Sequence, residues 1–143
     1  MIRRLILLFV LILVFFENKS QNIAQRLGYN KNAKLLIIHA DDIGVSHSVN
    51  QASFNAFKSE SISSGSIMVP CPWLLEVAKF SKLNPKYDLG LHLTITSEWE
   101  NYKWDGISSS NEISSLLNSS NHFYDNTEDV KKNAIASEVK KEI

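Results

Sequence analysis

The stretch that most constrains the fold is an apolar run that ends in two adjacent carboxylates and a glycine. Residues 35–38 are Leu-Leu-Ile-Ile, and residues 39–44 are His-Ala-Asp-Asp-Ile-Gly. A short aliphatic run bounded in this way predicts a strand buried on both faces, as in a parallel sheet. Sites in α/β folds lie at the carboxyl ends of such strands. Adjacent carboxylates repel each other unless a cation or proton lies between them, so Asp41 and Asp42 suggest a metal or acid/base role; alternatively, one caps the next helix.

Two helical patterns and two further apolar runs follow. Ser46 or Ser48 can cap a helix that ends near residue 60 and turns Val49, Ala52, Phe54 and Phe57 inward. A second helix is expected over 73–83, where Asn84-Pro85 stops it. Strands are expected over 64–69 and 89–95. This βαβαβ order predicts an α/β fold with a parallel sheet and right-handed crossovers.

Composition narrows the class of protein. The 143 residues are 44% apolar and 21% charged, which is typical of one globular domain. Lys plus Arg equals Asp plus Glu, at 15 each, so no basic field indicates a nucleic-acid partner. The single cysteine, Cys71, cannot form an internal disulfide.

The N-terminus differs in kind from the rest of the chain. Arg3 and Arg4 precede twelve unbroken apolar residues, 5–16. This run is shorter than the span of about 20 residues that crosses a bilayer, and it predicts an export signal over 1–21. An uncleaved anchor and a buried helix are the alternatives. Export would place the protein in a bacterial periplasm or cell envelope.

The second half of the chain is less regular. Residues 96–126 show no clear periodicity, which is common in substrate loops. Trp99 and Trp104 there could stack on sugar faces or simply pack the loop. One amphipathic helix is expected over 127–143, with Val130, Ala134, Ile135 and Val139 inward, and the pattern stops inside it as if cut.

His92 is the second chemical feature, because it lies between Leu91 and Leu93 in a strand predicted to be buried. A buried imidazole needs partners for both nitrogens, and hydrogen bonding or metal ligation can supply them. Asp42 and His92 both lie at carboxyl ends of strands in one parallel sheet, so they can converge. Oxygen and nitrogen donors together suit a divalent ion with open positions for water.

Four motifs carry a resemblance to a known family: residues 39–44, 46–50, 66–69 (Ser-Ile-Met-Val) and 90–94 (Gly-Leu-His-Leu-Thr). In sequence they resemble the YdjC-type (ChbG/HpnK) carbohydrate deacetylases. The resemblance implies that residues 22–143 form the N-terminal part of a deformed TIM-like (β/α) barrel. It also implies removal of N-acetyl groups from amino sugars or short chitooligosaccharides with a divalent metal, Mg2+ or Zn2+.

The resemblance also assigns roles to residues. Asp42 and His92 would be metal ligands and Asp41 the catalytic base, while the further histidine ligand of the family falls after residue 143.

His47 could line the substrate entrance or merely start its helix. His39 is expected to make a structural hydrogen bond, and His122 to lie at the surface.

Two other functions remain open from the sequence. The chain could be another metal hydrolase, such as a phosphoesterase, which needs further ligands. It could also be a non-catalytic part of a barrel, with little activity alone. Three strands would leave an open edge and exposed apolar surface, which predicts poor solubility or self-association, for example into a homo-oligomer.

Overall fold

The computed structural model describes residues 22–143, and the contacts of the chain divide it into two units. The first unit runs from Met1 to Leu36 and the second from Ile37 to Ile143. The predicted export signal, residues 1–21, lies outside the described residues and stays a prediction. Within the part of the chain that the structure describes, no helix is both long and apolar enough to cross a bilayer.

The described part of the first unit contains one short helix, α2 (Ile23–Arg26). Its N-cap is Asn22, whose side chain accepts a hydrogen bond from the backbone N–H of Gln25 over 3.0 Å. Gly28 follows with φ of 83°, the left-handed conformation in which a glycine commonly ends a helix.

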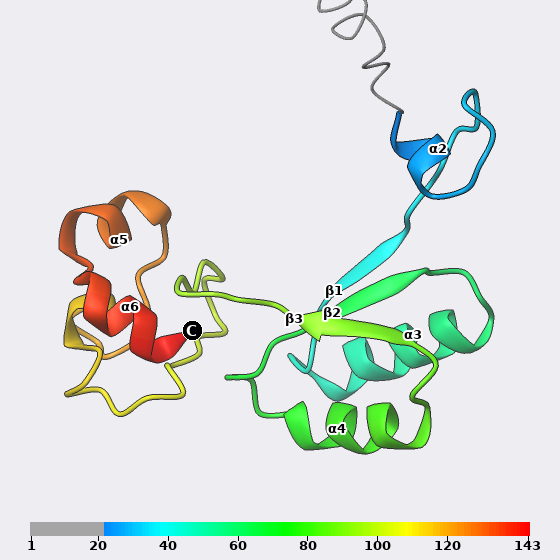
Figure 1. The fold of residues 1–143 in the computed structure, drawn as a ribbon. Coiled ribbons are helices and arrows are strands. Elements are labelled where there is room, and N and C mark those ends of the chain that lie inside the picture. The colour runs from blue at the N-terminus through cyan, green and yellow to red at the C-terminus, as the bar shows by residue number, and fades with distance from the viewer. Residues whose placement is uncertain (1–21) are drawn as a thin grey trace, which may run out of the picture. The chain divides into compact units, whose positions relative to one another are not determined.

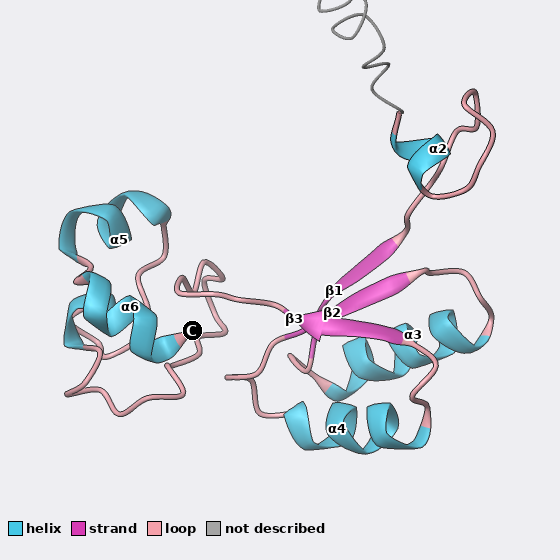
Figure 2. Ribbon diagram, viewed as in Figure 1, coloured by secondary structure: helices cyan, strands magenta, loops and turns pink. Residues whose placement is uncertain are grey.

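The second unit is built on a parallel sheet (Figures 1 and 2). Strands β1 (His39–Ile43), β2 (Ser64–Ile67) and β3 (Asp88–Leu91) lie in that order, and both neighbouring pairs are parallel. Helix α3 (His47–Lys58) connects β1 to β2, and α4 (Leu74–Leu83) connects β2 to β3. Both helices lie on the same side of the sheet (Figure 1). The predicted α/β class, with three parallel strands alternating with helices, is confirmed; closure into a deformed barrel stays a prediction.

The first strand begins later than the sequence predicts. The four aliphatic side chains of residues 35–38 are between 44% and 80% exposed. Pairing starts only at His39, which lies opposite Ser64 at the beginning of β2. The residues before His39 therefore have no strand beside them in the described chain, and the predicted buried strand over 35–38 was wrong.

Helix α3 buries Phe54 and Phe57 as expected, but the other two buried positions differ from those predicted. Its N-cap is Ser46, whose hydroxyl accepts a hydrogen bond from the N–H of Val49 over 3.3 Å. The buried positions are Asn50, Ser53, Phe54 and Phe57, while Ala52 is exposed and Val49 is only partly covered. Residues 50, 53, 54 and 57 follow the helical period, so two of the four inward positions are polar.

An aromatic cluster holds the two helices on the sheet. The rings of Phe54 and Phe80 stack with centroids 3.8 Å apart, and Tyr87 stacks on Phe80 at 5.6 Å. The buried members of this cluster are Ile43, Phe54, Phe57, Val77 and Phe80. Burying such side chains contributes about 1.5–3 kcal/mol each, which explains why two short helices suffice to cover this face of the sheet.

Residues 96–126 are irregular, as predicted, but well packed. They contain one 3-10 turn, η1 (Ser114–Leu116). A second cluster joins this segment to the loops after β1 and β2, and its buried members are Val45, Met68, Cys71, Trp104, Ile113, Leu116, Leu117 and Phe123. The loop is therefore held by apolar burial rather than by regular hydrogen bonding.

The helix predicted over 127–143 is two helices, α5 (Thr127–Asn133) and α6 (Ala136–Glu142). They are separated at Ala134 and Ile135, whose ψ angles are 132° and 126°. The Ile135 N–H donates instead to the hydroxyl of Ser115, over 2.9 Å. A hydrogen bond across the turn thus replaces one within the helix, which the apolar spacing could not indicate.

Gly65 tests the packing of α3 on the sheet. A Cβ there would lie 2.7 Å from the Ile43 Cδ1 atom and 3.1 Å from the Phe57 ring. We expect Gly65→Ala to lower the free energy of unfolding by about 1–3 kcal/mol, since a packed core must shift to admit the methyl group. The matched variant is Gly90→Ala in β3, where nothing lies within 4 Å. Urea unfolding of both variants is the measurement, and equal stabilities would contradict the packing described.

Candidate metal centre

Strand β1 holds one residue more than β2 over the stretch that contains the two aspartates. Ala40 pairs with Gly65 and Ile43 with Ile67, so three steps along β1 match two along β2. Asp42 has φ of 55°, a left-handed conformation that Asp adopts more readily than most residues. Successive residues of a regular strand point to opposite faces, and a bulge re-aims them. The bulge therefore allows the carboxylates of Asp41 and Asp42 to lie on the same side of the strand end.

Three potential ligands meet at this bulge. One ligand atom each from Asp41, Asp42 and His92 lies within 4.8 Å of the other two. Asp42 Oδ1 and His92 Nε2 are 3.4 Å apart. His92 comes directly after β3, and its N–H donates to the carbonyl of Ile67 over 2.9 Å. The expected convergence of Asp42 and His92 at the carboxyl ends of the strands is therefore observed.

The donor chemistry of this group fits a divalent cation. Carboxylate oxygens suit Mg2+, and a mixed set of carboxylate and imidazole donors also suits Zn2+. The carboxylate of Asp41 is exposed, while Asp42 and His92 are partly covered. The set leaves room for water or a substrate, as a catalytic metal site requires.

The loop after Asp42 is held by hydrogen bonds on each of its carbonyls. The carbonyl of Ile43 accepts from the Met68 N–H over 2.7 Å, and that of Gly44 accepts from the Trp73 N–H over 3.0 Å. The carbonyl of Val45 accepts from the Tyr102 hydroxyl over 2.8 Å. Gly44 has φ of 109°, and a Cβ would lie 3.0 Å from the Met68 carbonyl. Only glycine fits this turn, which is therefore fixed relative to β2 and α4.

The electrostatics of the group favour a bound cation. Burial and then the neighbouring Asp41 raise the pKa of Asp42 above its ordinary value of 3.8, while His92 opposes this rise. Ionised Asp42 therefore lacks sufficient positive charge nearby, and a divalent ion would supply it.

His92 is less buried than its neighbours in the sequence suggest. Leu91 and Leu93 are 66% and 62% exposed, so the prediction of a fully buried strand around His92 was wrong. β3 has a neighbour only on the β2 side within the described chain, which leaves its outer edge open. The case for His92 as a ligand therefore rests on its geometry rather than on burial.

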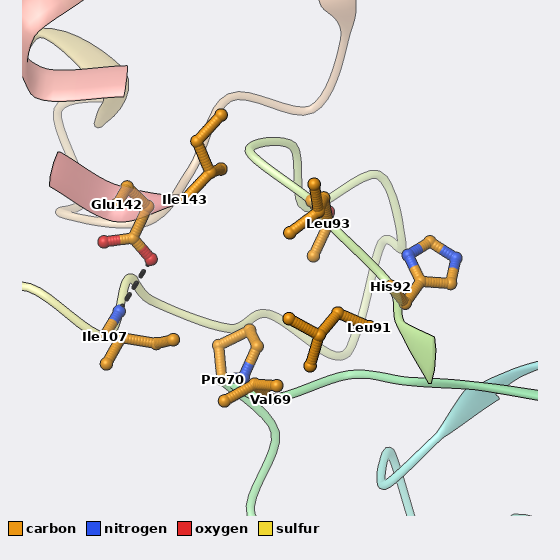
Figure 3. A pocket seen from close by; sticks show the side chains of 9 residues that line it. Val69, Pro70, Leu91, His92, Leu93, Ile107, Glu142 and Ile143 are labelled. Carbon is orange, nitrogen blue, oxygen red and sulfur yellow. Dashed lines mark hydrogen bonds between the residues drawn. The ribbon is translucent and has the colours of Figure 1, made fainter. Parts of the chain in front are cut away.

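An apolar cleft of about 180 Å³ borders His92 (Figure 3). Its walls include Val69, Pro70, Leu91 and Leu93, together with Ile107, whose N–H donates to Glu142 over 2.7 Å. Neither aspartate lines this cleft. Of the three potential ligands, only His92 lines the cleft.

The predicted substrate residues lie in different surroundings. His47 is exposed, with Nδ1 2.9 Å from Glu76 Oε1 and its ring 5.1 Å from that of Trp73. Trp99 is 37% exposed, whereas Trp104 is 4% exposed inside the second cluster. The burial of Trp104 favours the alternative that it packs the loop, and sugar stacking by these residues stays a prediction.

Two other histidines lie as expected. His39 contacts two hydroxyls of β2, with Nδ1 2.8 Å from Ser64 Oγ and Nε2 3.0 Å from Ser66 Oγ. His122 is partly exposed, with Nδ1 2.6 Å from Asp105 Oδ1. The hydrogen bonding predicted for His39 is observed, and His122 lies at the surface as predicted.

Sequence reasoning missed a polar network beneath the Asp42 loop. Asn50 is fully buried and bonds both Gly44 and Glu76. The signal was present, since Asn50 lies on the helical stripe of Phe54 and Phe57. A polar side chain at a buried position needs a hydrogen-bond partner, and a nearby loop backbone can supply one.

The fold and site define an α/β protein with two carboxylates and an imidazole grouped at the carboxyl ends of its strands, a possible metal-binding group. Residues 35–143 match the family described as YdjC-like protein, and the chain belongs to this family. It is 31% identical over 122 residues to a carbohydrate deacetylase of Thermus thermophilus, an alignment that covers 85% of this chain and 40% of that protein. The chain thus spans about 40% of this relative's length.

Two further relatives cover shorter stretches or resemble the fold. A chitooligosaccharide deacetylase of Yersinia enterocolitica is 36% identical over 63 residues, covering 44% of this chain and 25% of that protein. A crystal structure from Enterococcus faecalis, described as a candidate cellobiose-phosphate cleavage protein, superposes with a TM-score of 0.64 at 25% identity. That match covers 74% of this chain and 39% of the other.

The raised pKa of Asp42 gives a prediction with opposite effects on stability and metal binding. The folded, metal-free protein binds a proton at Asp42 more tightly than the unfolded chain, so its stability falls as pH rises from 3.8 through the raised pKa. We expect Asp42→Asn to raise the unfolding midpoint of the chelator-treated protein at pH 7 by roughly 1–3 °C. The gain is small because the side chain is 36% exposed and solvent screens it.

The same variant should lose Zn2+ binding in calorimetry, and its stability advantage should vanish at acid pH. The matched control is Asp88→Asn, an exposed aspartate at the start of β3. A metal-free Asp42→Asn protein less stable than the wild type at pH 7 would contradict this account of the charge.

Proposed function

We propose that this chain carries part of the active site of a divalent-metal hydrolase that removes N-acetyl groups from amino sugars or short chitooligosaccharides. The observation that carries the proposal is the convergence of Asp41, Asp42 and His92 in a member of the YdjC-like family. Support for the substrate class comes from the relatives described as carbohydrate and chitooligosaccharide deacetylases.

The residues divide the chemistry between them. Asp42 and His92 would hold the ion, Mg2+ or Zn2+, which when bound supplies a Lewis acid for the acetyl carbonyl and eases the deprotonation of water. Asp41 is the exposed member of the three, so its carboxylate is accessible to a water molecule. In the proposed reaction Asp41 takes the proton of the water that attacks the amide carbonyl; the C–N bond then breaks, acetate is released, and the amine takes up a proton as it leaves.

Contacts with the sugar, closure of the barrel and export are further parts of the proposal. The exposed side chains of His47 and Trp99 are the proposed sugar contacts, with Trp104 placed behind Trp99 at 5.8 Å between ring centroids. The open sheet is proposed to be part of a deformed TIM-like barrel, and its apolar edge to favour a homo-oligomer. Residues 1–21 are proposed to direct export to the periplasm or cell envelope.

A phosphorylated disaccharide is the second candidate substrate. It is favoured by the likeness to the Enterococcus faecalis protein described for cellobiose-phosphate cleavage. A phosphoesterase or related hydrolase could use the same two carboxylates and imidazole to hold its metal.

Release of acetate from an N-acetylglucosamine oligomer tests the proposed function. The assay uses metal-loaded protein: the 143-residue chain and, where the reading frame continues past Ile143, the longer product. We expect little turnover by the 143-residue chain and clear turnover by the longer one. Asp41→Asn should lower the rate at least about 100-fold, the usual contribution of a general base, with Zn2+ affinity little changed.

The Asp88→Asn variant is the matched control and should retain full activity. Phosphate or sugar release from cellobiose phosphate, measured in parallel, distinguishes the second candidate. Metal-loaded longer protein that releases no acetate from any N-acetylated amino sugar would contradict the deacetylase proposal.

A further inference from the structure

The turn that follows Asp42 is bound from below by one buried side chain of α3. The N–H of Gly44 donates to Asn50 Oδ1 over 2.7 Å, a short hydrogen bond in the fully buried part of the chain. This N–H belongs to the second residue after Asp42. The position of Asn50 therefore determines where the backbone leaves the bulge.

The orientation of the Asn50 amide is determined by its partners. Its Nδ2 donates to the carbonyl of Trp73 over 3.2 Å and to Glu76 Oε2 over 2.8 Å. Both are acceptors, so the amide nitrogen must face them and the oxygen must face Gly44. The amide thus uses its nitrogen for Trp73 and Glu76 and its oxygen for Gly44. A flipped amide would leave the Gly44 N–H without an acceptor.

Glu76 holds Asn50 in place from the first turn of α4. Its carboxylate accepts Asn50 on one oxygen and Gln51 and His47 on the other, each of the latter pair over 2.9 Å. These donors lower the pKa of Glu76, with Asn50 as the largest cause, so the group is ionised at neutral pH. Charge-assisted hydrogen bonds of this kind are stronger than neutral ones.

The backbone completes the connection. Trp73, whose carbonyl accepts from Asn50, donates its own N–H to the carbonyl of Gly44 over 3.0 Å. The N–H of Gly44 therefore bonds Asn50 itself, and its C=O bonds Trp73, which Asn50 also contacts. The three elements β1, α3 and α4 meet at this one residue.

We infer that Asn50 and Glu76 are positioning residues that set the Asp42 carboxylate for metal binding. Asp42 has a left-handed φ of 55°, which a freely turning backbone would seldom keep. The hydrogen bonds to Gly44 retain it, so that Asp42 Oδ1 stays 3.4 Å from His92 Nε2 before a metal binds. The inference rests on the proposed function in requiring that Asp42 binds a metal, and it is independent of the substrate.

Titration with Co2+, whose absorption reports coordination geometry, tests the inference without any assay of activity. Asn50→Asp keeps an acceptor for Gly44 but places a second carboxylate against Glu76. We expect it to weaken Co2+ binding about 10–100-fold and to change the absorption spectrum, as variants around metal ligands do. Glu76→Gln leaves one acceptor oxygen where three donors used two, and should give a smaller loss with a changed spectrum.

The matched control is Asn55→Ala, an exposed asparagine on the same helix, which should bind Co2+ as the wild type does. Hydrogen exchange adds a readout that needs no metal, since Asn50→Asp and Glu76→Gln should both speed exchange of the Gly44 amide. A merely structural role would lower the melting temperature and leave the Co2+ spectrum unchanged.

The outcomes separate this inference from the proposed function. Folded Asn50→Asp and Glu76→Gln proteins with wild-type affinity and spectrum would overturn the inference and leave the proposed function intact. Loss of the fold in Glu76→Gln would also overturn it, because a positioning role presumes that the fold survives. A wild-type protein that binds no Co2+ would overturn both.

Discussion

An extra residue in β1 brings Asp41 and Asp42 together, and the rest of the site depends on it. In a regular strand one of the two would point toward the helices, into the cluster of Phe54 and Phe57. The shift of register between Ala40 and Ile43 removes that alternation at the end of the strand. Two carboxylates then lie close together with little positive charge beside them. The arrangement is unfavourable for the empty protein and favourable for one that holds a cation.

The remainder of the unit keeps this unfavourable turn in place. Apolar packing of α3 and α4 fixes the helices on the sheet, and Asn50, on the same buried stripe of α3 as Phe54 and Phe57, bonds the loop. From the other side, the irregular segment after β3 contributes the hydroxyl of Tyr102 to the Val45 carbonyl. Packing therefore fixes the elements, and hydrogen bonds transmit their positions to the Asp42 backbone. Asn50 takes part in both, because it is buried in the packing of α3 and also bonds the loop.

Much of this arrangement follows from the sequence, with the failures at particular residues. The order of strands and helices, the Ser46 cap and the meeting of Asp42 with His92 follow from apolar periodicity and from the geometry of parallel sheets. The late start of β1 could not be predicted, because residues 35–38 are apolar enough for a strand and lack only a neighbouring strand to pair with. The division of the last helix at Ile135 depends on the distant Ser115 hydroxyl. Asn50 was missed because the inward positions of the helix were inferred from its apolar residues, Val49, Ala52, Phe54 and Phe57.

The central claim is that Asp42 and His92, with Asp41 beside them, bind a divalent cation at the carboxyl end of the sheet. Anomalous diffraction at the zinc edge, from crystals grown with Zn2+, tests it most directly. The account predicts one strong peak within bonding distance of an Asp42 carboxylate oxygen and of His92 Nε2, about 2.0–2.2 Å away. It also predicts that the peak is absent from crystals of Asp42→Asn. A zinc peak elsewhere, with these side chains placed as they are here and no ion between them, would contradict the claim.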